Sequence, residues 1–181
     1  IKKGIDRRYI SSIVLLEETA KTMEEADKLK QIVFERLNSG GEKLKPQETR
    51  NALYNGKFNQ LCIKQAENPK FKNLWNIPIS DNEEELLNNE LYRKMEDVEL
   101  VLRFYSFRWI NKLNRSTLEH FLDEYLRQAN KFSDETIDEL EEIFNDTIEL
   151  TFTLFGSDAF ILPTFERQSR RPTKTVYDSL L

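Results

Sequence analysis

The sequence predicts a mainly α fold, a multi-helix bundle with one β-strand at its N-terminal end. Apolar residues recur at helical spacing over most of the 181 residues, and N-cap residues precede several of these patterns. One segment differs, because residues 9–17, YISSIVLLE, are rich in β-branched and apolar side chains and predict a strand. The chain is therefore expected to be helical after this strand.

Cap residues, a glycine pair and a proline predict the first two helices. Thr22 and Glu25 have capping-box spacing, so the first helix is expected to begin at Thr22 and to end at the glycine pair at 40–41. Pro46 suits the first turn of a second helix that runs to Gly56. A tight corner is therefore expected between these two helices.

Three further segments follow the same reasoning. A third helix is expected over residues 58–67, and an aromatic, proline-containing connection follows it at 68–80. The long segment 91–113 is apolar on nearly every side between Val98 and Trp109, which predicts a helix at the centre of the core. Ser116, at capping-box spacing from Glu119, is expected to begin the next helix.

The last long helix is expected to begin after Ser133 and to end at Gly156. The acidic stretch DETIDELEE at its start predicts a solvated helix face. Trp75 and Trp109 are predicted to lie in the core. The helix is expected to pack against the core through one stripe, which consists of Ile137, Leu140, Phe144, Thr147, Thr151 and Leu154.

The chain is expected to be a single-domain fragment of a longer polypeptide. Residues 1–20 form the strand segment of this fragment, and residues 21–181 form its helical region. A lone strand cannot satisfy its own backbone groups and needs a sheet. The chain begins with Ile and ends in TVYDSLL, the pattern of an amphipathic helix just starting. The exposed strand is expected to pair with a second copy in a homodimer or to pack on a helix.

Composition excludes several classes of site. The chain has one cysteine, Cys62, and one histidine, His120, so no internal disulfide, thiolate zinc cluster or multi-histidine metal site is predicted. His120 is expected to be an ordinary helical residue. No apolar run is long enough to cross a membrane, and no signal peptide is evident, which predicts a cytoplasmic protein without a membrane partner. The net charge of -5 argues against nucleic-acid binding over the whole surface, but it allows a local basic patch.

The stretch FERLNSGG, residues 34–41, combines the glycine pair with polar side chains. Arg36 falls on the apolar stripe of the first helix, so its guanidinium is predicted to face the protein and to need a partner such as Glu48 or Gln47. Gln47 and Arg50 share one face of the second helix. Two interpretations are open, because these residues could lock a helix–turn–helix corner or bind a ligand. Spacing alone favours the corner.

These residues resemble a known family. FERLNSGG, a following leucine and QETRNALYNGKFN are similar to the signature of the GmrSD-type restriction endonuclease N-terminal domain, a ParB-related family. The stretches DVELVLRFYSFR and FGSDAF, and the basic segment leading to VYDSL, resemble this family as well. The resemblance implies that the strand at 9–17 is left over from a ParB-like α/β portion that lies upstream.

The resemblance implies a function in nucleotide-dependent, modification-sensing DNA restriction, which bacteria and archaea use against phage. Family members carry an upstream Asp-Gly-Gln-Gln-Arg motif linked to nucleotide hydrolysis, and the present sequence contains no such motif. The chain is therefore expected to brace a nucleotide or DNA site whose catalytic motif lies upstream, and no catalytic residue is assigned within it. The residues expected to do so match the signature: Arg36, Asn38, Gly40, Gly41, Gln47, Glu48, Arg50 and Asn51.

Basic residues near the C-terminus form a second predicted site. Clustered arginines and lysines bind DNA phosphates, and a solvated loop explains the same pattern equally well. Arg103, one turn after Glu99 on an otherwise apolar helix, predicts a structural ion pair rather than a ligand contact. The predicted contacts to the DNA backbone are Arg167, Arg170, Arg171 and Lys174.

Cofactors and partners follow from the resemblance. No cofactor is expected in the fragment, whereas the full-length protein is expected to use a nucleoside triphosphate with a divalent metal ion. The expected partners are DNA, the upstream ParB-like portion and a downstream nuclease domain of the same polypeptide. The alternative is a non-catalytic helical module that binds a partner protein or DNA. An upstream Asp-Gly-Gln-Gln-Arg motif would select the first function over the second.

Overall fold

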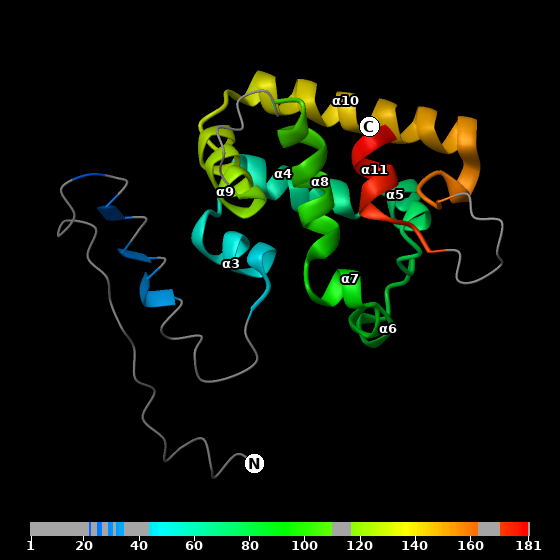
Figure 1. The fold of residues 1–181 in the computed structure, drawn as a ribbon, viewed down its shortest axis with the longest axis horizontal. Helices are drawn as coiled ribbons and strands as arrows, with labels where there is room; N and C mark the ends of the chain where they lie inside the picture. The colour runs from blue at the N-terminus through cyan, green and yellow to red at the C-terminus, as the bar shows by residue number, and fades with distance from the viewer. Residues whose placement is uncertain are drawn as a thin grey trace, which may run out of the picture. The chain divides into compact units, whose positions relative to one another are not determined.

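The computed structural model describes residues 22, 25–26, 29–30, 32–34, 44–109, 117–162 and 171–180. Contacts divide the chain into two compact units, Ile1–Lys43 and Leu44–Leu181, and each is described here by itself. Within the described residues the chain is mainly helical, as predicted, and contains no β-strand (Figure 1). The predicted strand at 9–17 and the predicted helix end at 40–41 lie outside these residues.

The first unit contains the start of the first predicted helix. Thr22 Oγ1 accepts a hydrogen bond from the backbone N–H of Glu25 at 3.2 Å, which is the cap that the sequence predicts. Helical backbone follows at 25–26, 29–30 and 32–34. The predicted helical character of this segment is therefore confirmed wherever the structure describes it.

The second unit consists of helices that pack around α8. This central helix contacts α3, α4, α7, α9 and α11, while α10 packs on α4 and α5. In chain order the elements are α3 (Pro46–Leu53), α4 (Lys57–Ala66), α5 (Pro69–Leu74), α6 (Glu83–Asn88), α7 (Glu90–Arg93), α8 (Glu96–Phe107), α9 (Leu118–Ala129), α10 (Asp134–Phe155), the 3₁₀ helix η4 (Gly156–Asp158) and α11 (Lys174–Leu180).

The ends of α9 and α10 show how far local cap signals determine helix boundaries. Ser133 Oγ accepts the N–H of Thr136 at 3.3 Å, and Gly156, with a φ of 65°, ends α10, as predicted. The predicted start of the preceding helix is wrong by one residue, because Thr117 rather than Ser116 caps α9. Both residue types can cap a helix, so residue type alone does not select between them.

Two other predicted boundaries need correction. The connection at 68–80 contains a helix, α5, because Asn68 Oδ1 accepts the N–H groups of Lys70 and Phe71 and Pro69 occupies the first turn. The predicted helix at 91–113 is divided into α7 and α8. Met95, with a φ of 54°, lies in the left-handed region between them and turns the chain.

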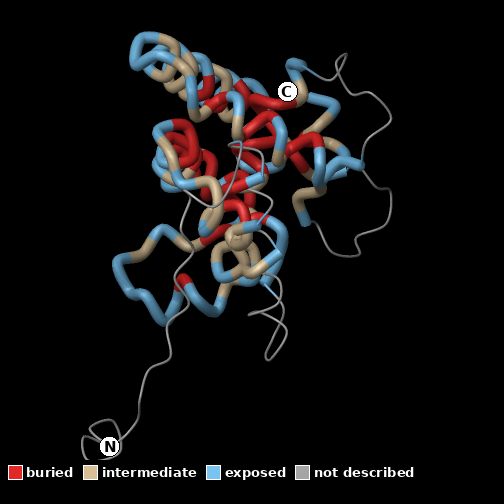
Figure 2. The backbone as a smooth tube through the Cα atoms, turned by 90° about the vertical axis from the view of Figure 1, so that its left-hand side faces the viewer, coloured by how far each residue is buried: buried red, intermediate tan, exposed pale blue. Residues whose placement is uncertain are grey.

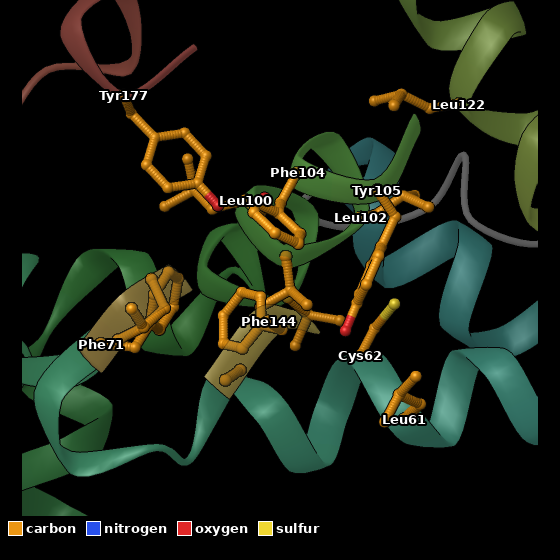
Figure 3. Packing of buried hydrophobic residues seen from close by; sticks show 14 of the residues in the cluster. Leu61, Cys62, Phe71, Leu100, Leu102, Phe104, Tyr105, Leu122, Phe144 and Tyr177 are labelled. Carbon is orange, nitrogen blue, oxygen red and sulfur yellow. Dashed lines mark hydrogen bonds between the residues drawn. The ribbon is translucent and has the colours of Figure 1, made fainter. Parts of the chain in front are cut away.

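The core is built around the apolar middle of α8, which confirms its predicted central position. Figure 2 shows the buried residues along the inner sides of the helices of the second unit. In Figure 3 the ring of Phe144 lies between the rings of Phe71 and Tyr105. The centroid of the Phe144 ring is 5.6 Å from that of Phe71 and 6.0 Å from that of Tyr105. Tyr105 donates its hydroxyl hydrogen to the Leu140 carbonyl, and Tyr177 donates to the Leu100 carbonyl, both at 2.9 Å. Aromatic packing thus connects α5, α8, α10 and α11.

Two apolar residues predicted to face the core do not. Trp75 is buried as predicted, but Trp109 is 37% exposed because it lies beyond the last turn of α8. Leu154, predicted to belong to the buried stripe of α10, is also exposed. Ile148, which the predicted stripe omits, is fully buried between Phe144 and Thr151 along that helix.

Gly56 allows α3 and α4 to approach the end of α9. A Cβ atom at this position would lie 2.5 Å from Asn130 Cγ, which is far inside van der Waals contact. The Asn130 side chain donates to the Tyr54 carbonyl at 2.8 Å and accepts the N–H of Asn59 at 3.1 Å. Any larger residue at position 56 would therefore displace an amide that connects α9 to the α3–α4 turn.

Candidate functional site

The site begins with the short helix α3, which places two polar side chains in the protein interior. Pro46 occupies its first turn, and Glu48 Oε2 accepts the backbone N–H of Lys45 at 2.7 Å. Gln47 and Arg50 are three residues apart and therefore lie on one face of the helix. That face is turned inward, because Gln47 is 1% exposed and Arg50 is 2% exposed.

Arg50 connects three helices. Its Nε donates to Asp123 Oδ1 on α9 at 2.6 Å, and its Nη1 donates to Glu99 Oε2 on α8 at 3.0 Å. Nη1 also donates to Gln47 Oε1 within α3, and Nη2 donates to the Glu119 carbonyl of α9, both at 3.3 Å. A guanidinium has several donors in a rigid plane and can satisfy such a set, whereas a lysine ammonium has a single charged centre.

A cavity of about 240 Å³ lies beside this network. Glu99 and Arg50 line it together with Lys174 of α11, whose Nζ lies 3.0 Å from Glu96 Oε2 and 3.7 Å from Glu99 Oε1. The apolar part of the wall comes from Leu118 and Leu122 of α9 and from Pro46 of α3. The full set of lining residues is Lys45, Pro46, Gln47, Arg50, Glu96, Glu99, Leu118, Glu119, Leu122 and Lys174.

Gln47 supplies the chemical feature that distinguishes the cavity. Its Oε1 accepts from Arg50, which orients the amide so that Nε2 is the remaining donor. This Nε2 is buried and has no hydrogen-bond partner among the described residues. A buried donor without a partner carries a free-energy cost of about 1–3 kcal/mol. Gln47 thus lines the cavity with a side chain whose donor, Nε2, is buried beneath the surface of the wall.

The charges around the cavity are largely paired. Arg50 contacts Glu99 and Asp123, and Lys174 contacts Glu96 and Glu99. Because its guanidinium is occupied by carboxylates, Arg50 is arranged to hold the walls of the site in place. The arrangement suits a ligand with both donors and acceptors better than a ligand that needs several unpaired cations.

Other reactive groups lie away from this cavity. Burial raises the pKa of the Cys62 thiol far above its ordinary value, so the thiolate nucleophile is disfavoured. Among the described residues, no group of three or more His, Cys, Asp or Glu side chains is arranged to hold a metal ion. In the same part of the chain, no helix combines the length and apolar character needed to cross a membrane.

The signature residues predicted from the sequence are only partly brought together. Gln47 and Arg50 lie in the site, whereas Glu48 caps α3. Asn51 faces α4, where its Oδ1 accepts from Asn59 Nδ2 at 2.8 Å. The remaining signature residues lie outside the described residues: Arg36, Asn38, Gly40 and Gly41.

The predicted DNA-backbone residues do not form one described cluster. Lys174 lies at the cavity, and Arg171 is exposed before α11. Arg167 and Arg170 lie outside the described residues. Their predicted contact with DNA stays a prediction.

Arg103 forms a structural ion pair, as its setting in the apolar helix predicts, but its partner is unexpected. Its Nε donates to Asp178 Oδ1 of α11 at 3.0 Å, and its Nη2 contacts Asp178 Oδ2. The neighbouring Glu99 instead contacts Arg50 and Lys174. His120 lies exposed in the first turn of α9, as expected for an ordinary helical residue.

The acidic members of the site were not predicted. Glu96 and Glu99 lie one turn apart at the start of an apolar helix, and Asp123 lies on α9 one turn after Glu119, which accepts from Arg50 through its backbone carbonyl. Such pairs at helical spacing beside apolar residues are a usable signal, because a buried arginine requires acidic partners. Sequence spacing does not show that Arg50 contacts one carboxylate from each helix, Glu99 of α8 and Asp123 of α9.

Comparisons with protein families, with curated proteins and with solved structures found no match.

Proposed function

We propose that the chain is the helical part of a nucleotide-dependent, modification-sensing DNA restriction protein that acts in defence against phage. In this proposal the Arg50 network braces a nucleotide or DNA site whose catalytic motif lies upstream. The sequence resemblance to the GmrSD-type family supplies the reaction class. The geometry around Arg50 supports the bracing role.

The convergence of distant segments supports the proposal. Gln47 and Arg50 come from QETRNALYNGKFN, and Glu99 comes from DVELVLRFYSFR. Lys174 comes from the basic segment that leads to VYDSL. These three stretches carry the resemblance and are far apart in the sequence, yet their side chains line one cavity. A shared site explains why polar residues of these types occur in all three.

The observation that carries the proposal is the pair of buried side chains on α3. Arg50 fixes the distance between α3, α8 and α9 through charged hydrogen bonds, and Gln47, which lines the cavity, has a buried Nε2 without a partner among the described residues. A phosphate, sugar or base oxygen is the complementary acceptor. The chain thus contributes a preorganised wall, and the chemistry belongs to groups outside it.

The test is a phosphate-release assay on the full-length polypeptide with ATP or GTP, Mg²⁺ and DNA. Gln47→Leu is expected to weaken the apparent affinity for nucleotide or DNA about tenfold, because one hydrogen bond to a charged or polar ligand is lost. The matched control is Gln65→Leu, which changes a buried glutamine of α4 that does not line the cavity. The present chain alone is expected to release no phosphate. Equal effects of the two substitutions would contradict the assigned site.

One observation favours a second function, a non-catalytic helical module that binds a partner protein or DNA. Arg50 and Lys174 are both paired with carboxylates, so neither is free to neutralise a triphosphate. Under this alternative, the full-length protein would bind DNA or a partner without hydrolysing nucleotide. Phosphate release that depends on DNA and on Gln47 would exclude it.

A further inference from the structure

The long helix α10 has a second apolar face that does not belong to the core. The helix itself packs on α4 and α5 along one side of the second unit (Figure 1). Phe144, Ile148 and Thr151 are its buried residues. The helix spans 22 residues, so its outer side offers an extended surface.

The outer apolar face is a regular stripe. Ile143, Leu150 and Leu154 follow at intervals of seven and four residues, which places them on one side of the helix, with the half-buried Thr147 between the first two. Ile143 is 37% exposed, Leu150 is 59% exposed and Leu154 is 64% exposed. The stripe is about 17 Å long at the rise of an α-helix. Contiguous exposed apolar surface of this kind is typical of interaction sites.

Acidic residues accompany this stripe. The sequence of α10 contains eight Asp or Glu residues and no Lys or Arg. Three of the eight, Asp134, Glu141 and Glu149, pair with lysines of α4 and α5. The other five acidic residues of α10 are exposed.

The outward charges border the apolar stripe. Glu139 lies one turn before Ile143, and Asp146 lies one turn before Leu150, with Glu142 one turn before Asp146. None of these three carboxylates pairs with a lysine or arginine in the described ranges 44–109, 117–162 and 171–180. The surface therefore combines an apolar stripe with an acidic border.

We propose that this α10 surface docks a basic amphipathic helix of a partner protein. The occupant would place leucine-like side chains at helical spacing against Ile143, Leu150 and Leu154, and lysines or arginines against the acidic border. Like charges disfavour a second copy that pairs through the same face. The same negative charge disfavours nucleic acid and anionic membranes. This inference is independent of the proposed function of the cavity.

The experiment measures binding of a synthetic peptide of about 16 residues, long enough to cover the stripe. The probe carries leucines at positions i, i+4, i+7 and i+11 and lysines on both sides of them. It is added, with a fluorescent label, to the complete chain, and binding is followed by anisotropy. Two comparison peptides replace either the lysines by glutamates or the leucines by serines.

The variants distinguish specific binding at the apolar stripe from nonspecific hydrophobic binding. Leu150→Gln combined with Leu154→Gln is expected to weaken binding of the lysine peptide at least about tenfold, since two central apolar contacts are removed. Glu139→Gln combined with Glu142→Gln is expected to weaken it less and to reduce its salt dependence. The matched control is Ile79→Gln, because Ile79 is an equally exposed apolar residue away from α10.

The outcomes decide the proposal. Binding that needs both the leucines and the lysines of the peptide, and that is lost only in the α10 variants, supports it. No measurable binding overturns it, and so does binding that is equal in the α10 variants and in Ile79→Gln. Self-association that disappears in the leucine double variant would also overturn it, because a second copy would then be the occupant. Circular dichroism confirms that each variant keeps its helices.

Discussion

Two buried arginines fasten helices in this molecule, and their surroundings differ. Arg50 divides its donors among acceptors on three helices, with Glu99 and Asp123 as its charged partners. Arg103 directs two donors to one carboxylate, Asp178, and so connects only α8 with α11. The first arrangement is a branched network, and the second is a closed pair.

The difference indicates different roles. The guanidinium of Arg103 also lies over the Phe107 ring, 4.9 Å from its centroid, which completes an enclosed structural contact. The Arg50 network instead borders a cavity and orients Gln47, whose Nε2 has no partner among the described residues. Most buried polar groups in proteins have a hydrogen-bond partner, so the unpartnered Nε2 is a difference between the two networks. The Arg103 pair is structural, whereas in our proposal the Arg50 network braces a ligand site.

Arg50→Met is expected to have the largest effect on stability. It leaves the partly buried Asp123 carboxylate without a cation and Glu99 with Lys174, 3.7 Å away, as its remaining cation among the described residues, which should lower the free energy of unfolding by about 3 kcal/mol. Urea denaturation followed by circular dichroism measures this loss. Arg50→Lys should recover less than half of it, because one ammonium cannot reach acceptors on both α8 and α9. A loss below about 1 kcal/mol for Arg50→Met would contradict the branched network.

Arg103→Met is expected to lower the free energy of unfolding by about 2 kcal/mol. The loss is smaller because a single carboxylate, that of Asp178, is left without its partner, and because the Arg103 side chain is less deeply buried than that of Arg50. The methionine also retains apolar contact with the surrounding core. The same denaturation series reports the value. An effect larger than that of Arg50→Met would reverse the proposed order of the two arginines.

Asp97 also lies on α8, and the pKa of its carboxyl group shows the effect of burial rather than of an ion pair. Burial raises its pKa from 3.8 to about 7, although a hydrogen bond from the Val98 N–H and the charge of Lys72 act in the opposite direction. Between about pH 4 and pH 7 the Asp97 carboxyl group is therefore protonated in the folded state and ionised in the unfolded state. The free energy of unfolding falls as pH rises through this window.

Asp97→Asn should remove this pH dependence. At pH 8 the variant is expected to be about 1 kcal/mol more stable than the parent, because it avoids a buried unpaired charge while its amide is still desolvated. Near pH 4 the two proteins should be close in stability. Thermal unfolding at a series of pH values measures both. A parent whose stability rises between pH 4 and pH 7 more steeply than that of the variant would contradict the raised pKa.

Gln47→Leu is expected to have the smallest effect, within about 0.5 kcal/mol of the parent. Loss of the hydrogen bond to Arg50 is offset by removal of the unpartnered donor. Gln65→Leu provides the contrast, because Gln65 Nε2 donates to the Glu141 carbonyl at 3.3 Å and its removal should cost about 1 kcal/mol. A larger loss for Gln47→Leu than for Gln65→Leu would indicate that Gln47 is a structural amide.

The sequence was most informative where one or two neighbouring residues determine the backbone conformation at a helix end. Pro46, Ser133 and Gly156 indicated helix ends that the structure contains. The break before α8 had no such signal, since Met95 adopts its left-handed conformation in a context set by packing. Thr117 and Ser116 are adjacent residues of similar capping ability, so sequence alone could not choose between them.

The site was predictable only in part, for a physical reason. The types and spacing of Gln47 and Arg50 marked one polar face of α3. Their partners at Glu99 and Asp123 are 49 and 73 residues from Arg50 along the chain. Which acidic side chains meet the guanidinium depends on how α8 and α9 pack, and local spacing carries no information about that.

The most direct measurement of the central claim is the side-chain amide signal of Gln47 in a ¹H–¹⁵N spectrum of the full-length protein. The signal is assigned by its loss in Gln47→Leu, and Gln65 serves as the internal reference. The account predicts that Mg²⁺ with ATP or GTP, or DNA, shifts the Gln47 signal and leaves the Gln65 signal in place. A Gln47 signal that stays fixed while the protein binds these ligands would show that the cavity beside Arg50 is not the site.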